Sequence, residues 1–456
     1  MASRLLLGEN ALQDTICLPN PKEPREVKAH HDTTRKASNQ KFVVMDASGA
    51  WMKRWGQQFE ALGIEFLRSH DGMHPDAFSH TSLAVWAASN ERHDYLSLDN
   101  LPEGFHGHTR APSNKMMLDF CDHLVNMGGL QDHLYQGEVQ SLEPCGSGVN
   151  VIVNASSGTE KMFAKHVVLA RGPTWNRQWP SFYKTLDSAA LAEIYHAWDL
   201  FDAPDRMKKI QGRGVIVGGG LTSAHLCAQL AESGSIDLLM RRNRCMKQYD
   251  LHLSWMNTSE GNRRQLRANF EQASVEERAA VNKSVRDGGS ITPELNLVIS
   301  ELEKKGLVKV HESTEIVSAS WHGCWSLVLN NEEVITADYL ICATGTHVDI
   351  SEDPLLSKLQ DAHPLRIVAG LPVLSEHLQW GELPVHLMGN AAALELGPDA
   401  VNMTGAMRGA FRIWPVLTRK QFKKKSKRSG GQASSRKCID SGKCVPTSSW
   451  KSGFNV

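Results

Sequence analysis

Short apolar runs alternate along this chain with longer stretches in which apolar residues recur at helical spacing. The runs have the length and the β-branched content of buried strands, and they lie at 42–45, 149–153, 166–170, 214–217, 236–240, 338–342 and 385–388. Strands that are apolar throughout are typical of parallel sheets covered on both faces, whereas helices follow a period of 3.6 residues. The alternation therefore predicts an α/β fold.

Helical periodicity is clearest where the chain is rich in aromatic residues. From Trp51 to Phe59 the aromatic side chains recur every four residues, and a stripe in the core explains them better than a cofactor site does. Further helices are expected over 113–125, 263–286 and 401–414. Glycine-containing turns at 146–148 and 156–158 separate strand-like segments, so they predict antiparallel hairpins.

The apolar run at 214–217 enters a glycine cluster and then a helical pattern. This strand–turn–helix sequence is that of a dinucleotide-binding loop, with the phosphates at the helix N-terminus. Gly218 allows a sharp turn, and Gly220 lets the backbone approach a pyrophosphate. Ser223, at the third position of the motif, has a small side chain. The expected binding residues are Gly218, Gly219, Gly220 and Ser223. A glycine-rich turn in another kind of α/β protein remains the alternative interpretation.

Two arginines, Arg241 and Arg242, end the next strand. An NAD site usually offers an acid at this point for the ribose 2′-hydroxyl, whereas an NADP site places arginine there for the 2′-phosphate. The guanidinium group stays charged and matches phosphate geometry. The pair therefore favours NADPH over NADH, although an exposed strand end would also account for it.

The composition argues against several classes of function. Among 456 residues, 50 Lys and Arg balance 50 Asp and Glu, so no overall field favours nucleic acid. No run of eighteen apolar residues predicts a membrane span. The nine cysteines form no Cys-x-x-Cys pair, so neither a metal site nor a dithiol reductase is expected, and a cytoplasmic location fits. The basic run at 419–428 is interpreted as part of a disordered tail, with a nuclear address as the alternative.

Further short motifs flank the glycine loop in a fixed order. They are Leu67–Ser69 with His74–Asp76, Ala170–Pro173, His196–Asp199, Ala343–Gly345, and Gly389–Asn390 with Gly397–Pro398. In this order, over about residues 42 to 414, the chain resembles the flavoproteins with two dinucleotide-binding domains. It is most similar to flavin monooxygenases of the N-hydroxylating (lysine and ornithine) and Baeyer–Villiger kinds.

The resemblance implies two Rossmann-like domains, with the NADP-binding domain inserted in the FAD domain. The implied boundaries are 41–205 and 336–416 for the FAD-type parts, 206–335 for the NADP-binding domain, and 417–456 for the tail. The implied FAD-binding residues are Asp46, Ala343, Thr344, Gly345, Gly389 and Asn390. Arg68, His74 and His196 are candidate polar contacts near the flavin, although a structural role is favoured for each.

One departure from that family concerns the start of the FAD-type domain. The family opens on a strand, a Gly-x-Gly-x-x-Gly loop and a helix, whereas Phe42–Asp46 resembles the family's second strand. Residues 1–40 are polar and are expected to be irregular, and Gly8 is the only glycine before Gly49. We therefore expect an incomplete FAD domain that binds FAD weakly. Asn390, where relatives often carry Asp, is a mild change.

The sequence supports two hypotheses of different classes. The first is an FAD- and NADPH-dependent oxidoreductase, monooxygenase-like, in which hydride passes from NADPH to the flavin and oxygen is then activated. The second is a flavin-deficient protein that binds NADP and acts in regulation or interaction without catalysis. For the enzyme we expect a small-molecule substrate, no nucleic-acid partner and no metal. The sequence leaves the substrate and the oligomeric state open.

Overall fold

The computed structural model describes residues 42–76, 79–98, 109–172, 176–251, 255, 260–286 and 288–426, with side chains up to Thr418. The segment expected to be irregular at 1–40 and the tail beyond Ser426 lie outside these residues. The chain divides into two units between Trp414 and Pro415, where the basic sequence begins. Every sheet that the structure describes belongs to the first unit.

A five-stranded parallel sheet forms the NADP-type half of this unit. Its strand order is β12 (Val308–His311), β11 (Ile236–Leu239), β10 (Gly214–Val217), β16 (Tyr339–Cys342) and β9 (Ile194–His196). Every residue of β11 and β16 is buried, as the uninterrupted apolar runs predict.

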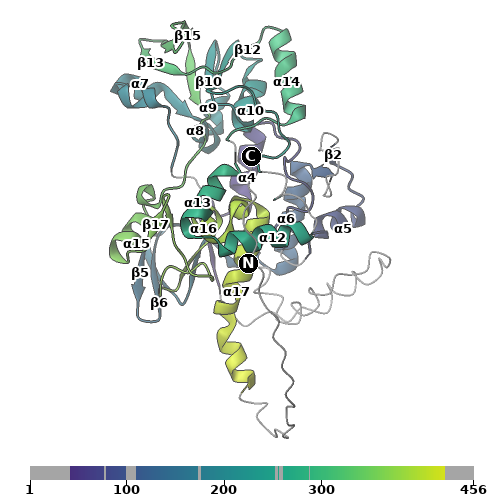
Figure 1. Ribbon diagram of the computed structural model, residues 1–456, viewed down its shortest axis with the longest axis vertical. Helices are drawn as coiled ribbons and strands as arrows, with labels where there is room; N and C mark the ends of the chain where they lie inside the picture. Colours follow the sequence, from purple (N-terminus) through teal and green to yellow (C-terminus); the bar gives the residue numbers. More distant parts are fainter. Residues whose placement is uncertain are drawn as a thin grey trace, which may run out of the picture. The chain divides into compact units, whose positions relative to one another are not determined.

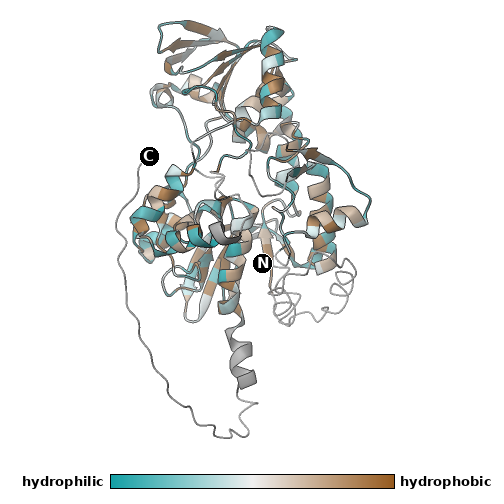
Figure 2. Ribbon diagram, turned by 45° about the vertical axis from the view of Figure 1, so that its right-hand side comes forward, coloured by the Kyte–Doolittle hydropathy of each residue, from teal (hydrophilic) through white to brown (hydrophobic). Residues whose placement is uncertain are grey.

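Helices α10 (Leu221–Leu230) and α14 (Pro293–Lys304) lie side by side next to this sheet (Figure 1). Helix α14 begins at Thr292, whose hydroxyl accepts from the backbone N–H of Leu295, and Pro293 occupies the first helical position. In Figure 2 the strands of this half are mostly hydrophobic, whereas the helices carry both colours. This is the pattern of helices that bury one face against a sheet.

Two short parallel strand pairs belong to the FAD-type half. Strand β1 (Val44–Asp46) pairs with β4 (Leu134–Gln136), and β8 (Val167–Leu169) pairs with β19 (Val385–Leu387). The strands expected from the apolar runs at 42–45, 166–170 and 385–388 are confirmed. Within the described ranges the two pairs remain separate sheets.

Each half contains an antiparallel three-stranded sheet, which comes just before β8 in the FAD-type half and just before β16 in the NADP-type half. In the FAD-type half it consists of β5 (Glu138–Cys145), β6 (Gly148–Ala155) and β7 (Gly158–Ala164), which confirms both predicted hairpins. In the NADP-type half it consists of β13 (Ile316–Trp321), β14 (Trp325–Leu329) and β15 (Val334–Ala337). The fold is α/β with two dinucleotide-binding halves, the NADP-type half inserted in the other, as expected.

Strand pairing extends the NADP-type sheet past the boundaries expected from the sequence. Strands β9 and β16 lie outside 206–335, yet both pair within this sheet. The sheet therefore includes one strand before residue 206 and one strand after residue 335. The domain boundaries at 205 and 335 stay a proposal.

Two half-buried residues of the aromatic stripe near the start pack against the hydrophobic core, as predicted. Helix α4 (Lys53–Ala61) presents Trp55 and Phe59, whose rings stack with their centroids 4.5 Å apart. They pack on α6 (Asn114–Gly128), and the Trp55 indole donates to Asn114 Oδ1 at 2.8 Å. Ser113 caps α6 through the backbone N–H of Met116.

Helix α17 (Met403–Ser426) runs through Pro415, beyond the end that we expected at Trp414. Pro415 has no backbone N–H to donate, and the backbone hydrogen bonds of the neighbouring residues continue the helix. The remaining elements are α5 (Ser82–Ser89), α7 (Ser188–Glu193), α8 (Ala197–Asp202), α9 (Pro204–Met207), α12 (Glu260–Gln272), α13 (Val275–Ser284), α15 (Leu356–Ala362), α16 (Ala393–Leu396), β2 (Tyr95–Ser97), β3 (Arg110–Pro112), β17 (Ile367–Val368) and β18 (Leu371–Pro372), with five short 3₁₀ helices between them.

None of the helices that the structure describes is long and apolar enough to cross a membrane. In the same residues no cluster of three His, Cys, Asp or Glu side chains could hold a metal ion.

The NADP-type core should dominate the stability of its half. Leu238 on β11 is fully buried, so Leu238→Ala should lower the free energy of unfolding by about 2–5 kcal/mol, because it leaves a cavity. Leu297 on α14 is 68% exposed, and Leu297→Ala should change it by less than about 0.5 kcal/mol. Urea unfolding of both variants measures the two values, and equal losses would contradict the assignment of the core.

Candidate functional site

The glycine loop lies at the carboxyl end of β10, in the middle of the NADP-type sheet. Gly218 has φ +151°, and a Cβ there would come within 2.5 Å of the carbonyl oxygen of Ala343 at the end of β16. Only glycine fits this close approach of two strand ends. The loop then delivers the chain into α10, whose N-terminal N–H groups face the carboxyl edge of the sheet.

Gly220 is covered by the chain's own backbone. A Cβ on Gly220 would meet the Cα of Gly289 at 3.3 Å, so the turn that contains Gly289 packs on the loop. Ser223 is fully buried and its hydroxyl donates to the Gly220 carbonyl oxygen at 2.8 Å. The small side chain expected at this position therefore serves helix–strand packing, and a Cβ on Gly219 would meet the Met240 side chain at 3.8 Å.

Arg241 and Arg242 come directly after β11 and are exposed. The nearest acid to Arg241 is Glu315, with Nε and Oε1 3.9 Å apart, and two-thirds of the Arg241 side chain is exposed. The guanidinium of Arg242 lies beside Gly288, next to the turn that covers Gly220. Both cations thus lie at the edge of the sheet where the glycine loop ends, as the sequence predicts.

A pocket in the FAD-type half opens at the carboxyl ends of β8 and β19. Gly172 and Asn390 are among its lining residues. A Cβ at either Gly172 or Gly389 would meet no atom within 4 Å, so the backbone is open to a ligand at both strand ends. Ligands of open α/β sheets bind at this edge.

The other residues expected at the flavin lie apart from that pocket. Asp46 is exposed at the end of β1, where its carboxylate accepts from the backbone N–H of Ser48 at 2.8 Å. Ala343, Thr344 and Gly345 come after β16. Ala343 lies beside Gly218 of the glycine loop, whereas the Thr344 hydroxyl donates to the carbonyl oxygen of Gln178 and the Gly345 carbonyl accepts from the Gln178 N–H. Their contact with flavin stays a prediction.

Arg68 serves as a link between distant segments. Its guanidinium donates to the carbonyl oxygens of Gln248 at 2.6 Å and Lys247 at 2.9 Å, and to the Ser290 hydroxyl at 2.7 Å. Burial lowers its pKa from the ordinary value. Arg68 also lines a second pocket, together with Tyr249, Asp250, Leu251, Arg286 and Asn402.

His74 and His196 are both fully buried. His74 packs edge-on against Phe120, with ring centroids 5.5 Å apart, which places it in the core beside α6. His196 ends β9: its Nδ1 accepts from the Trp198 N–H at 3.3 Å and its Nε2 donates to the Gly345 carbonyl oxygen at 3.2 Å. These two bonds require a neutral imidazole, and burial lowers its pKa to about 4.

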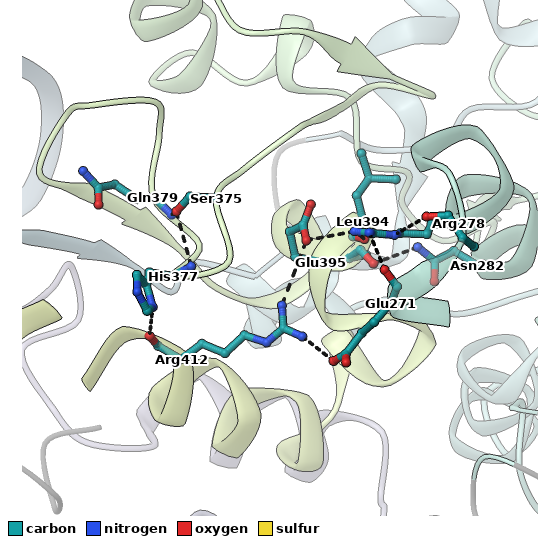
Figure 3. A network of polar contacts seen from close by, with 11 residues as sticks. Glu271, Arg278, Asn282, Ser375, His377, Gln379, Leu394, Glu395 and Arg412 are labelled. Atoms are coloured by element: carbon teal, nitrogen blue, oxygen red, sulfur yellow. Dashed lines mark hydrogen bonds and ion pairs between the residues drawn. The ribbon is translucent and has the colours of Figure 1, made fainter. Parts of the chain in front are cut away.

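An ion-pair network that the sequence does not predict ties the helices of 260–286 to the C-terminal segment. Glu395 lies between the guanidinium groups of Arg278, at 2.9 Å, and Arg412, at 4.0 Å, and Arg412 also donates to Glu271 at 2.6 Å (Figure 3). Burial raises the pKa of Glu395, which the arginines oppose. The only sequence hint was the clustering of charges in 263–286, which identifies no partner.

A second unforeseen ion pair lies at the mouth of the FAD-side pocket. Arg171 contacts Asp353, and both line the pocket with Asn176, whose amide donates to the Asp349 carbonyl oxygen at 2.7 Å. Arg171 stands in the motif that we matched to the family's hinge, but its partner is 182 residues away. Such a distant pairing leaves no local sequence pattern.

No protein-family model matches the chain, and no curated protein sequence matches it. Solved structures do. The Kutzneria sp. 744 ornithine N-hydroxylase, in a complex with reduced FAD, NADP⁺ and L-ornithine, shares 16% identity over 83% of this chain and 92% of its own, with a TM-score of 0.61. The ornithine hydroxylase of Pseudomonas aeruginosa shares 15% over 92% and 97%, with a TM-score of 0.62. The L-lysine 6-monooxygenase of Pseudomonas syringae shares 13% over 87% and 94%, with a TM-score of 0.58.

This chain has the fold of the N-hydroxylating flavin monooxygenases. The likeness covers nearly the whole length of those enzymes, and it confirms the resemblance drawn from the motifs. At this level of identity it establishes the arrangement of the two halves, while the chemistry has to be argued from the chain's own residues.

Buried neutral histidines should make stability depend on pH. Burial lowers the pKa of His196, His225 and His386 to about 4, from an ordinary value of 6.5. Between these values the unfolded chain takes up protons that the folded chain rejects, so stability should fall as pH drops from about 6.5 to 4. Urea unfolding at pH 7, 6 and 5 should show a smaller fall for His196→Gln than for the native chain.

The exposed His322 gives a matched control for removing one histidine. His322→Gln should keep the native pH dependence. If His196→Gln kept it as well, the neutral role assigned to His196 would be wrong.

Proposed function

We propose that this chain is an NADPH- and FAD-dependent oxidoreductase of the monooxygenase kind. The observation that carries the proposal is the NADP-type half: a glycine loop ends the central strand of a parallel sheet, and two exposed arginines end the next strand. The fold shared with the ornithine and lysine hydroxylases supports the assignment of the other half to FAD.

NADPH would bind across the carboxyl edge of the five-stranded sheet. The N–H groups at the start of α10 would hold the pyrophosphate, since they are free of helix partners and carry the positive end of the helix dipole. Arg241 and Arg242 would pair with the 2′-phosphate, because planar guanidinium groups bind phosphate through two parallel hydrogen bonds. Gly218 and Gly220 keep this edge free of side chains.

FAD would bind at the carboxyl ends of β1, β8 and β19. The Asp46 carboxylate is suited to a ribose hydroxyl, and the open backbone at Gly172 and Gly389 would admit the ribityl chain beside Asn390. Bound FAD supplies the acceptor for hydride from NADPH and the chemistry of oxygen. The three solved relatives act on ornithine or lysine, so a small amine is the substrate class that we propose.

The alternative is a flavin-deficient protein that binds NADP and acts in regulation or interaction. The two hypotheses share the NADP-type half and differ in whether FAD binds.

Replacing both arginines should weaken NADPH selectively. Arg241→Ala with Arg242→Ala should raise the Kd for NADPH roughly ten- to hundredfold, as the loss of about 1.5–3 kcal/mol in charged hydrogen bonds implies, and should leave NADH nearly unchanged. Titration followed by nucleotide fluorescence gives both constants. Arg206→Ala removes an exposed cation of α9 and should change neither. Equal losses for the two nucleotides would contradict the assignment.

The chain by itself should hold FAD weakly. Without charged N–H contacts to the pyrophosphate, each worth roughly 1.5–3 kcal/mol, its Kd should lie in the micromolar range or above. Titration with FAD by fluorescence quenching measures it. Stoichiometric FAD that survives dialysis would overturn this expectation.

The oxidoreductase assignment is tested separately by NADPH oxidation at saturating FAD, with and without ornithine, lysine or cadaverine. Oxidation that depends on Arg241 and Arg242 is expected. If FAD and NADPH both bound and NADPH were not consumed, the oxidoreductase assignment would be wrong, whereas NADPH binding without FAD binding would favour the regulatory alternative.

A further inference from the structure

The turn at 288–290 packs directly on the glycine loop. A Cβ on Gly289 would lie 2.9 Å from both the backbone nitrogen and the Cα of Gly220, and a Cβ on Gly220 would lie 3.3 Å from the Cα of Gly289. Contacts this short leave Gly289 no room for a side chain and leave Gly220 hardly any. Two backbone segments that are far apart in the sequence therefore meet where the loop enters α10.

The same turn also reaches the second of the arginines that follow β11. Gly288 has φ +89°, in the left-handed region that favours glycine, and its Cβ position lies 3.7 Å from Nη1 of Arg242. The turn thus lies against both elements that we assign to phosphate binding, the glycine loop and Arg242. It borders the place where the pyrophosphate of a nucleotide would lie.

Backbone hydrogen bonds hold the residue that follows this turn. The N–H of Lys247 donates to the carbonyl oxygen of Ile291 at 2.9 Å, and the N–H of Ile291 donates to the carbonyl oxygen of Cys245 at 2.9 Å. The two segments are thus paired in parallel at Met246 and Ile291. Ile291 is fully buried in the core of the NADP-type half, so this bridge gives the turn one fixed end.

Arg68, which comes from the FAD-type half, ties the turn itself to the bridge. Its guanidinium donates to the Ser290 hydroxyl at 2.7 Å, and to the carbonyl oxygens of Lys247 at 2.9 Å and Gln248 at 2.6 Å. The Gln248 side chain donates back to the Arg68 carbonyl oxygen at 3.1 Å, and Ser290 is only 3% exposed. A guanidinium offers its donors in one rigid plane, so Arg68 fixes the turn and the bridge relative to each other.

We propose that Arg68 is a positioning residue for the nicotinamide nucleotide. Through Ser290 it holds the 288–290 turn against Gly220, so that the turn forms one wall of the pyrophosphate site. A turn released from Arg68 has to be ordered when the nucleotide binds, and this cost lowers the affinity. The proposal rests on the proposed function, because it takes the glycine loop as the site of the NADPH pyrophosphate.

Two substitutions in the full chain test this role. Arg68→Met removes the three hydrogen bonds and keeps the length of the side chain, whereas Ser290→Ala removes only the acceptor in the turn. Arg68→Met should raise the Kd for NADPH about tenfold and Ser290→Ala about threefold, through the loss of charge-assisted hydrogen bonds. The double variant should match Arg68→Met, because both changes remove one contact. Titration followed by nucleotide fluorescence gives each Kd.

NADH and FAD separate positioning from other roles of Arg68. NADH carries the same pyrophosphate, so its Kd should rise as well, unlike the result expected for the Arg241 and Arg242 variant. The Kd for FAD should keep its native value. A higher Kd for FAD with unchanged nucleotide binding would mean that Arg68 contacts the flavin, and it would overturn the proposal.

Two further variants guard against misfolding and against a general effect of lost charge. Arg68→Lys keeps the charge without the planar fork and should give a loss between those of the native chain and Arg68→Met. Arg54→Met removes a 46% exposed cation whose Nη2 lies 2.9 Å from Asp202, and it should change no Kd. Urea unfolding identifies any variant that is not folded, and Ser290→Ala then carries the test.

Native affinity for NADPH and NADH in the folded variants would overturn the proposal and leave the proposed function standing. Additive losses in the double variant would overturn it too, since Arg68 would then act without Ser290. If the native chain bound neither nucleotide, the proposal and the proposed function would both be wrong. The expected losses in a chain that does not oxidise NADPH at saturating FAD would support positioning and contradict the function.

Discussion

The central strand of a parallel sheet is the constraint on which both halves of this protein depend. Such a strand needs ladder partners on both sides, and its carboxyl end fixes where a nucleotide can bind. In the NADP-type half β10 meets this requirement between β11 and β16, and Gly218 packs against the carbonyl of Ala343. Strand β10 therefore positions the glycine loop, the start of α10 and the arginines after β11.

In the FAD-type half that central strand is not among the described residues, and the site differs accordingly. The remaining strands form two separate pairs, and the pocket at the ends of β8 and β19 is built from loop residues such as Arg171 and Asn390. Among the described residues, the NADP-type half has a glycine loop at the N-terminus of a helix. This difference separates an NADPH-dependent flavin enzyme from a protein that binds only the nicotinamide nucleotide.

Local patterns in the sequence predicted most of the elements and the NADP-type loop. Periodicity and glycine spacing, which are patterns within about twenty residues, predicted the strands and both hairpins. They also predicted the packing of Trp55 and Phe59 and the positions of Gly218 and Ser223. The features that could not be predicted depend on contacts across the chain. Arg68 bonds to Ser290, 222 residues away, and Arg171 pairs with Asp353, so no local pattern marks either as structural.

Sheet membership depends on pairing between strands that are far apart in the sequence. Strand β16 pairs with β10, which brings Ala343 beside the NADP-type loop. His196, a candidate contact of the flavin, uses both ring nitrogens in hydrogen bonds, one to the Gly345 carbonyl oxygen and one to the backbone N–H of Trp198 at the start of α8. These roles emerge only when the strands are paired.

Native-state hydrogen exchange tests the central claim most directly, since it reports the ladder bonds of each strand. The account predicts that amides of 236–239 and 339–342 are strongly protected, whereas those of 44–46 and 167–169 exchange at least tenfold faster. Equal protection in the two halves would contradict it, because β1 and β8 would then already have the central strand between them.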